Sequence, residues 1–255
     1  MEPHRIVSRN EWLIARKAHL AEEKAFTRAR DALSRKRREL PWVKVDKAYA
    51  FDGPNGKETL ADLFGGKSQL IVYHFMLGPD WEEGCPSCSL LADHFDGAAV
   101  HLAQRDVAFV VVSRAPLPRI EAFKRRMGWH FKWVSSFASD FNYDYHVSAS
   151  PEEKATGKVT YNYETTEFPS EERPGASVFF KNAAGDVFHT YSAYGRGLDI
   201  LIGAYNLLDI APKGRDEASL KYGMAWVRHH DKYEGAVVDP AASYKEPKTS
   251  DSSCD

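Results

Sequence analysis

The sequence predicts an α/β protein with a central mixed sheet flanked by helices, and three features carry that prediction. Two nearly continuous apolar runs, Leu70 to Leu77 and Val107 to Val112, are typical of strands buried on both faces. A segment with helical spacing of apolar residues follows each run. Further along, Ser177 to Phe180 and Val187 to Ser192 flank a turn, which is a β-hairpin pattern. The first two features favour parallel strands with right-handed crossovers, and the hairpin adds antiparallel strands.

Length and composition fit a single core with extensions. The chain has 255 residues, of which 43% are hydrophobic and 27% charged, so it is able to bury a substantial core. A net charge of −2 gives no sign of a nucleic-acid partner, and no window approaches the roughly eighteen apolar residues of a membrane span. The start, Met1 to His4, has no signal-peptide pattern, and three cysteines do not make a disulfide framework. The expected compartment is the cytoplasm.

Residues 1–40 predict an N-terminal helical extension. Ser8 to Glu11 fits a capping box, and Pro41 ends the helical pattern. Apolar residues recur along it mostly at multiples of seven, namely Leu13, Leu20, Phe26, Leu33 and Leu40. So narrow a stripe must pack on the main domain or on a second copy of the chain, and a homodimer through this helix is one expected assembly. The basic residues lack interleaved aromatics, which predicts no nucleic-acid binding.

Residues 41–210 predict the main domain. Besides the strands named above, two further strands are expected at 42–51 and 131–134. Helical segments are expected at 60–64, 90–104, 116–128 and 198–208. Residues 150–173 are rich in Glu, Thr, Lys and Pro and are an expected insertion.

Residues 211–255 predict an irregular C-terminal extension with a disordered end. One helix is expected within it, around residues 220–228. Cys254 lies in the last few residues and has no expected partner.

The segment Gly84-Cys85-Pro86-Ser87-Cys88-Ser89 lies between a buried strand and a helix, which is a redox arrangement. Two cysteines three positions apart at a helix N-terminus are close enough for a disulfide, and the partial positive charge there favours the thiolate of the first. Cys85 is therefore the candidate nucleophile and Cys88 the resolving thiol. Pro86 suits a first helical turn, and Ser87 lies between the thiols. A C-P-x-C sequence also resembles the redox sites of glutaredoxins and periplasmic thiol oxidases.

Two plainer interpretations stay open for this cysteine pair. A C-x-x-C pair forms half of many structural zinc sites, but zinc needs four ligands and the chain has no second C-x-x-C. His94 and His101 follow the pair at spacings that fit no common zinc pattern. His229 and His230 are adjacent, which is too close for them to chelate one ion easily. In the second interpretation, the two cysteines are an inert pair. We expect no bound metal and no cofactor.

Loop and strand residues near the pair are candidates for lining its site. Right-handed crossovers place Trp81 to Ser89 and Ser113 to Pro116 together at the carboxyl edge of the strands. His74, inside the apolar run, is either a hydrogen-bonded core residue or a group that tunes the thiol pKa. Arg114 and Arg126 either hold an anionic substrate or thiolate, or pair with Asp140 or Asp144.

Two aromatic segments are further candidates. Asp140 to Tyr145, which includes Asn142, is unusually aromatic and acidic for a loop and is an expected binding surface. His189, Tyr191, Tyr194 and Arg196 cluster at one end of the hairpin, where they either line a pocket or pack against each other.

The order of turn, helical turn, Gly-Lys, buried strand, cysteine loop and helix resembles the thioredoxin superfamily, particularly its peroxiredoxin-like branch. More specifically, the chain resembles the bacterial thioredoxin-like family called domain of unknown function 899, from about Ser8 to Tyr233. The motifs that carry this resemblance are residues 84–89, 113–116, 126–129, 133–136, 140–142 and 189–197. The resemblance implies a thioredoxin-like fold and assigns no activity.

The sequence departs from two patterns of the superfamily. Peroxiredoxins carry P-x-x-x-T-x-x-C around the reactive cysteine, whereas Glu82 stands three residues before Cys85, so a peroxidase site of that kind is not predicted. Thioredoxins place a cis-proline before the strand that faces the dithiol. Pro174 is the nearest candidate, and the sequence does not predict a cis bond there.

Two function hypotheses follow. The first is a thiol–disulfide oxidoreductase whose partner is a disulfide-containing protein or a small thiol, with neither nucleic acid nor membrane involved. The second is a non-catalytic thioredoxin-fold binding module or redox sensor, in which the cysteine pair is structural and Phe141 to Tyr145 recognise the partner.

Overall fold

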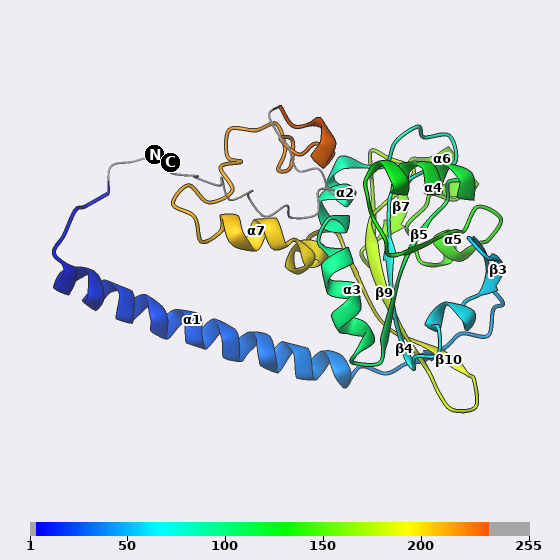
Figure 1. Ribbon diagram of the computed structural model, residues 1–255, viewed down its shortest axis with the longest axis horizontal. Coiled ribbons are helices and arrows are strands. Elements are labelled where there is room, and N and C mark those ends of the chain that lie inside the picture. Colours follow the sequence, from blue (N-terminus) through cyan, green and yellow to red (C-terminus); the bar gives the residue numbers. More distant parts are fainter. Residues whose placement is uncertain (1–3, 235–255) are drawn as a thin grey trace, which may run out of the picture.

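The computed structural model describes residues 4–234, and one eight-stranded mixed sheet organises them (Figure 1). The strand order is β1-β10-β9-β4-β5-β6-β2-β3. These strands are β1 (Val43–Lys44), β2 (Ala50–Gly53), β3 (Gly56–Thr59), β4 (Gln69–His74), β5 (Val107–Ser113), β6 (Lys132–Ser135), β9 (Gly175–Lys181) and β10 (Val187–Tyr194). A separate two-stranded sheet pairs β7 (Val159–Tyr161) with β8 (Glu164–Thr166).

The four central strands have the thioredoxin topology. β4 pairs in parallel with β5 and antiparallel with β9, which in turn pairs antiparallel with β10. β6 extends the sheet in parallel beyond β5. The predicted fold class, a mixed sheet of thioredoxin type flanked by helices, is therefore confirmed.

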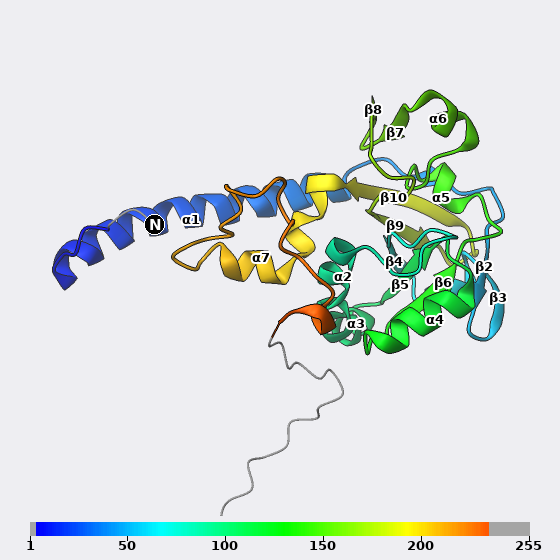
Figure 2. The ribbon, with the colours of Figure 1, turned by 90° about the horizontal axis from the view of Figure 1, so that it is seen from above.

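The helices between the parallel strands lie on one face of the sheet (Figure 2). α2 (Pro86–Ala92) and α3 (Phe95–Ala103) connect β4 to β5, and α4 (Leu117–Arg126) connects β5 to β6. Both right-handed crossovers move the same way across the sheet, so their helices share a face. The remaining helical elements are η1 (Asp62–Phe64), α5 (Phe141–Asp144), α6 (Pro151–Thr156), η2 (Gly195–Leu201), α7 (Gly203–Leu208) and η3 (His230–Lys232).

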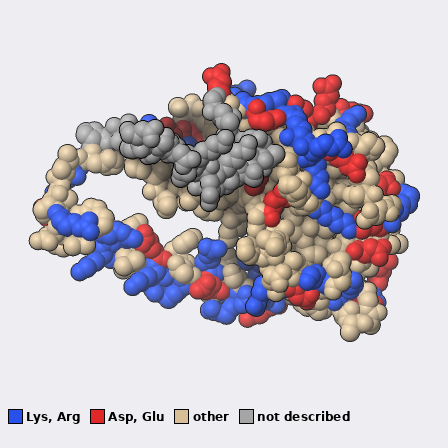
Figure 3. Space-filling model, in the orientation of Figure 1, with Lys and Arg blue, Asp and Glu red and all other residues tan. Residues whose placement is uncertain are grey.

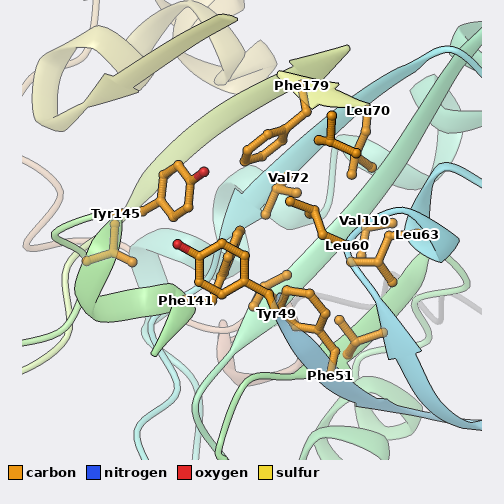
Figure 4. Close-up of a cluster of buried hydrophobic side chains, with 14 of the residues drawn as sticks. Tyr49, Phe51, Leu60, Leu63, Leu70, Val72, Val110, Phe141, Tyr145 and Phe179 are labelled. Carbon is orange, nitrogen blue, oxygen red and sulfur yellow. The ribbon is translucent and has the colours of Figure 1, made fainter. Parts of the chain in front are cut away.

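Alternation along β4 divides the core into two clusters. Tyr73 and Phe75, which are two residues apart, pack with Cys88, α4 and α7 on what we call the dithiol face. Val72 packs on the opposite side, in the same cluster as Phe141 (Figure 4). We call this side the histidine face because the His74 ring lies against Phe141. The two clusters share the sheet but separate its chemistry.

The N-terminal helix α1 (Arg9–Arg38) projects away from this core as a 30-residue arm (Figures 1 and 2). The predicted capping box of Ser8 and Glu11 is confirmed, since each side chain bonds the other's backbone N–H. None of its residues is buried. Lys and Arg side chains run along it (Figure 3), and its last turn reaches the sheet where Arg37 lies over the Tyr191 ring.

Four expected elements differ from the structure. The single helix expected at 198–208 is the 3-10 helix η2 followed, after the extended Ile202, by the short helix α7. The single strand expected at 42–51 is two separate strands, β1 and β2. The helix expected at 90–104 is broken into α2 and α3, because the His94 ring bonds Leu90 O at 2.7 Å and the His94 N–H shifts to Leu91 O. No helix forms at 220–228, where Met224 has a left-handed φ of 67°.

Among residues 4–234, no helix is long and apolar enough to cross a membrane. Cys254 and the chain end expected to be disordered lie outside the described residues.

Candidate functional site

The cysteine loop is held at the carboxyl edge of β4 by backbone hydrogen bonds. Cys85 N–H donates to Met76 O at 3.0 Å, and Ala115 N–H donates to Leu77 O at 2.9 Å. The loops after β4 and β5 therefore meet, as the crossover argument predicts.

Gly84 brings the backbone before Cys85 against the aromatic core. A Cβ at this position would lie 2.5 Å from the Phe75 ring and 2.8 Å from the Phe123 ring, closer than side-chain carbons approach. Gly84 O accepts a 2.7 Å hydrogen bond from the buried His229 ring. The residue before the nucleophile is thus fixed from both sides.

The two thiols have opposite environments. Cys85 is half-buried at the start of α2, whereas Cys88 is buried one turn further on. Hydrogen bonds from the Cys88 thiol and from the N–H groups of Cys88 and Ser87 lower the pKa of Cys85 to about 7. Burial, together with the neighbouring Cys85, raises the pKa of Cys88 well above its usual value. Cys85 is therefore the thiol that ionises at neutral pH.

Tyr73, on β4, belongs to the same buried cluster as Cys88. Its hydroxyl is buried and has no hydrogen-bond partner among the described residues, and its position near Cys88 opposes the rise in that thiol's pKa. Burial raises the pKa of Tyr73 well above its usual value, so the phenol stays protonated. It can donate to a thiolate that forms at Cys88.

A cavity of about 420 Å³ opens beside the dithiol. Its walls are mostly apolar and aromatic. The lining residues are Tyr73, Met76, Cys85, Ser87, Cys88, Leu91, Tyr161, Phe168, Pro174, Gly195, Arg196, Leu198, Asp199, Ile202, Tyr205, Glu217, Gly223 and Met224. Its size falls within the range of small-molecule sites, about 300–1,000 Å³.

Two segments outside the four-stranded core close this cavity. The insertion (residues 150–173) contributes Tyr161 and Phe168, whose rings lie 5.2 Å apart. The C-terminal segment (residues 209–234) contributes Glu217, whose Oε1 accepts hydrogen bonds from the Tyr205 hydroxyl, Met224 N–H and Trp226 Nε1. One carboxylate thus ties the C-terminal segment to α7.

The C-terminal segment is also fastened to the cysteine loop itself. Besides the bond from His229 to Gly84, Arg126 bridges Glu83 at 2.6 Å and Asp231 at 2.8 Å. Lys232 pairs with the same Glu83 at 2.8 Å. These contacts hold the side of the cysteine loop that faces away from the cavity.

The structure brings four of the predicted site residues together. Cys85, Ser87, Cys88 and Arg196 line the cavity, although the Arg196 side chain is 85% exposed and stands at its rim. Pro86 is exposed at the first turn of α2, and Trp81 packs against the dithiol-face cluster. The peptide bond before Pro174 is trans.

Seven other predicted residues lie away from the cavity lining, namely His74, Arg114, Arg126, Asp140, Asn142, His189 and Tyr191. Arg114 is 3.7 Å from the buried Glu172 and lies over the Tyr143 ring, so it pairs structurally but not with Asp140 or Asp144. Those two carboxylates share Lys47 instead. Arg126 belongs to the loop network above. Asn142 is buried and accepts a 2.7 Å bond from Ser136.

The prediction that Phe141 to Tyr145 form a binding surface is wrong. Phe141 is 0% exposed and Tyr145 is 8% exposed, and both belong to the histidine-face core. The aromatic content of this segment serves packing, because T-shaped and tilted contacts join it to Tyr49, Phe51 and Phe179.

His74 is the hydrogen-bonded core residue of the two alternatives, and it does not tune the thiols. Its Nε2 is 2.8 Å from Ser177 Oγ, which is 2.8 Å from Ser192 Oγ, and that oxygen is 2.8 Å from His189 Nε2. We call this the His–Ser–Ser–His chain. Burial lowers the pKa of His74 to about 3, so the ring is neutral.

A β-bulge makes that chain possible. The register of β9 and β10 shifts between His189 and Tyr191, which returns His189 and Ser192 to the same face. His189 and Tyr191 line a second cavity of about 490 Å³, next to Leu40 and Pro41 after the end of α1. It shares no lining residue with the dithiol cavity.

Several lining residues had no functional signal in the sequence. Tyr73 was recognisable only by its parity with Phe75 on the buried strand. Tyr161 and Phe168 lie in the insertion, and Glu217 lies in a segment with no motif. Within residues 4–234, no group of three or more His, Cys, Asp or Glu side chains is arranged to hold a metal ion.

Comparisons with known proteins complete the description. A family model described as "Bacterial protein of unknown function (DUF899)" matches residues 1–233. No curated protein matches the chain. Among solved structures, the Xanthomonas campestris bacterioferritin comigratory protein aligns at 13% identity over 60% of this chain and 87% of its own, with a TM-score of 0.41.

Two other solved structures are similarly distant. Peroxiredoxin Q from Xanthomonas campestris aligns at 12% identity over 65% of this chain and 94% of its own, with a TM-score of 0.43. Peroxidoxin BcpB from Mycobacterium tuberculosis aligns at 12% identity over 64% and 94%, with a TM-score of 0.40. Likenesses this low carry no conclusion about the chemistry of the dithiol.

Proposed function

This chain belongs to the DUF899 family of bacterial proteins, and because the family description assigns no activity, we propose one from the site: a thiol–disulfide oxidoreductase. Cys85 is the nucleophile and Cys88 is the resolving thiol. The observation that carries the proposal is their asymmetry, since Cys85 opens onto the cavity with a pKa of about 7 while Cys88 is buried behind it.

The proposed reaction is a two-step exchange. The Cys85 thiolate attacks one sulfur of a disulfide, forms a mixed disulfide and releases the first substrate thiolate. Cys88 then loses its proton and attacks the Cys85 sulfur, which releases the second substrate thiolate and leaves a Cys85–Cys88 disulfide. The substrate gains two electrons and the protein loses them, so an external thiol reductant restores the dithiol.

Substrate trapping tests this division of labour. Cys88→Ser and Cys85→Ser are compared in a Cys254→Ser background, so that adducts report only the pair. We expect Cys88→Ser to accumulate reducible mixed disulfides on non-reducing gels and Cys85→Ser to accumulate few. The double variant should fold normally, at a cost of about 1–2 kcal/mol.

The competing hypothesis is a redox sensor or binding module with a structural cysteine pair. It predicts equal, low adduct formation in the two single variants, with cell extract and with small disulfides alike. That outcome would remove the oxidoreductase proposal.

A further inference from the structure

We propose that the substrates of this dithiol are small, uncharged, aromatic or apolar disulfides, in preference to protein disulfides or anionic disulfides such as glutathione disulfide. This inference rests on the proposed function and deepens it. It is carried by the walls of the dithiol cavity, by the pairing of its polar groups and by the position of its charges.

The walls restrict access to Cys85. Tyr73 of β4, Met76 in the loop after it and Cys85 just before α2 line the cavity. η2, α7, the insertion and the C-terminal segment add further lining residues. Phe168 comes from the insertion, and Met224 from the C-terminal segment. A folded protein would have to lay a disulfide into a cavity of about 420 Å³ past these two segments, whereas a small molecule fits inside.

Most polar groups along the walls already have partners. The Tyr161 hydroxyl donates to Pro174 O at 2.7 Å and accepts from Gly195 N–H at 2.9 Å. The Tyr205 hydroxyl donates to Glu217, which accepts two further bonds. A ligand therefore meets aromatic and aliphatic surface with few free hydrogen-bonding groups, and an apolar ligand loses least on entering.

The charges disfavour an anionic ligand. Asp199 and Glu217 both line the cavity, and Asp199 is held by Arg215 at 2.8 Å. Among residues 4–234, the one lining cation is Arg196, which is 85% exposed at the rim. A disulfide with several carboxylates would bring its charge toward two existing carboxylates, without a buried cation to receive it.

The first arm of the test measures specificity. Reduction of 4,4′-dithiodipyridine, glutathione disulfide and insulin is followed with the full chain, and each rate constant is divided by that of dithiothreitol with the same disulfide. We expect this ratio to be at least about tenfold higher for the uncharged aromatic disulfide than for the other two.

A variant of the wall sharpens that measurement. Phe168→Lys, at a half-buried lining position, should lower kcat/KM for 4,4′-dithiodipyridine about tenfold and raise it severalfold for glutathione disulfide. Phe168→Leu should restore the aromatic preference. Phe137→Lys is the matched control, because Phe137 is 49% exposed and does not line the cavity, so it should change neither rate.

A second arm does not depend on turnover. The thioether 4,4′-dipyridyl sulfide cannot be reduced but has the same rings, and it should protect Cys85 from iodoacetamide in the wild type and not in Phe168→Lys. If the wild type turns over all three disulfides with equal ratios and the thioether gives no protection, the substrate class is wrong and the oxidoreductase proposal stands. If the thioether protects but Cys85→Ser and wild type show equal turnover, the binding site stands and the oxidoreductase proposal is wrong.

Discussion

Tyr73 and His74 are neighbours on β4, both are buried, and they show how differently the two faces of one sheet are used. Tyr73 lines the dithiol cavity near Cys88, and its hydroxyl has no hydrogen-bond partner among the described residues. His74 points to the opposite face, where Ser177 occupies its Nε2 and the Phe141 and Tyr145 rings cover it. The polar group beside the cavity is available to a ligand or a thiolate, and the polar group enclosed by side chains is not.

The His–Ser–Ser–His chain is consistent with a structural role. Successive polar atoms of the chain lie 2.8 Å apart, and His189 Nε2 also lies 3.1 Å from Tyr191 O, a carbonyl that can only accept. His74 Nδ1 has no hydrogen-bond partner among the described residues. The dithiol face holds no such closed chain, because Cys85 faces the cavity.

The largest expected difference between the faces is in thiol reactivity. Cys85 should react with iodoacetamide at least about a hundredfold faster than Cys88 at pH 7, because only Cys85 is both accessible and ionised. Its rate should rise with pH, reach half its maximum near pH 7 and then level off. Site-resolved mass spectrometry measures both rates. Equal slow labelling of the two thiols would contradict the asymmetry, and His74→Leu should leave the midpoint unchanged.

The histidine face should affect how the free energy of unfolding depends on pH. His74 has a folded pKa of about 3, lowered by burial, so below the unfolded value of roughly 6.5 the unfolded chain binds a proton that the folded chain does not. The contribution of His74 to stability is therefore fully present above pH 6.5 and falls with decreasing pH, by about 1 kcal/mol per pH unit near pH 5.

This slope is measured as the difference between wild type and His74→Leu in the urea-derived free energy of unfolding at several pH values. Glu172 contributes in the opposite direction, because burial raises its folded pKa to about 7 and stability is lost as pH rises from its unfolded value toward 7. His74→Leu should flatten the acid limb and lower stability by about 2 kcal/mol at pH 7, since Ser177 loses a buried partner. An unchanged acid limb in that variant would assign the proton uptake elsewhere.

Tyr73→Phe should have a smaller effect, confined to the dithiol face. The hydroxyl opposes the raised pKa of Cys88 and can donate to a thiolate that forms there, so its removal should slow release of the mixed disulfide by about threefold. Stopped-flow measurement of the second exchange step tests this. Alkylation of Cys85 and the urea midpoint should stay within error of the wild type, and a shifted Cys85 midpoint would show that Tyr73 acts on the first thiol.

The smallest effect on either face is expected from α1. We propose that its apolar stripe pairs with a second copy, because Phe26 and Leu33 are 71% and 59% exposed and lie seven residues apart. Phe26→Glu with Leu33→Glu should lower the mass measured by sedimentation equilibrium and leave the Cys85 pKa and the acid limb unchanged. A mass that stays the same would remove the dimer proposal, while altered thiol reactivity would show that α1 influences the site.

The comparison also shows what the sequence could and could not predict. The buried strands, the cysteine loop and the capping box follow from local patterns, and these predictions are confirmed. The face on which His74 lies follows from the alternation of side chains along β4, which places His74 on the opposite face from Tyr73 and Cys88. The closeness of His74 to the dithiol in the sequence does not reveal this. The bulge at Thr190 that aligns His189 with Ser192 has no local signature.

The cavity was less predictable than the dithiol because its walls are assembled from distant segments. Tyr161 is 76 residues from Cys85 in the numbering and Glu217 is 132 residues away, and each is placed by tertiary hydrogen bonds rather than by a motif. The aromatic segment at Phe141 to Tyr145 misled in the opposite direction, since aromatic residues fill cores as readily as they form recognition surfaces.

Gly84 has a consequence for how this cysteine loop can be exchanged between proteins. Because Phe75 and Phe123 occupy the space of a side chain at position 84, the segment from Gly84 to Ser89 cannot keep its conformation when it is moved alone into another protein. A graft of Gly84-Cys85-Pro86-Ser87-Cys88-Ser89 into another host would need both phenyl rings and the His229 imidazole to reproduce its backbone path. In the other direction, a library that varies position 84 would select first for repacking of an aromatic cluster and only then for redox behaviour.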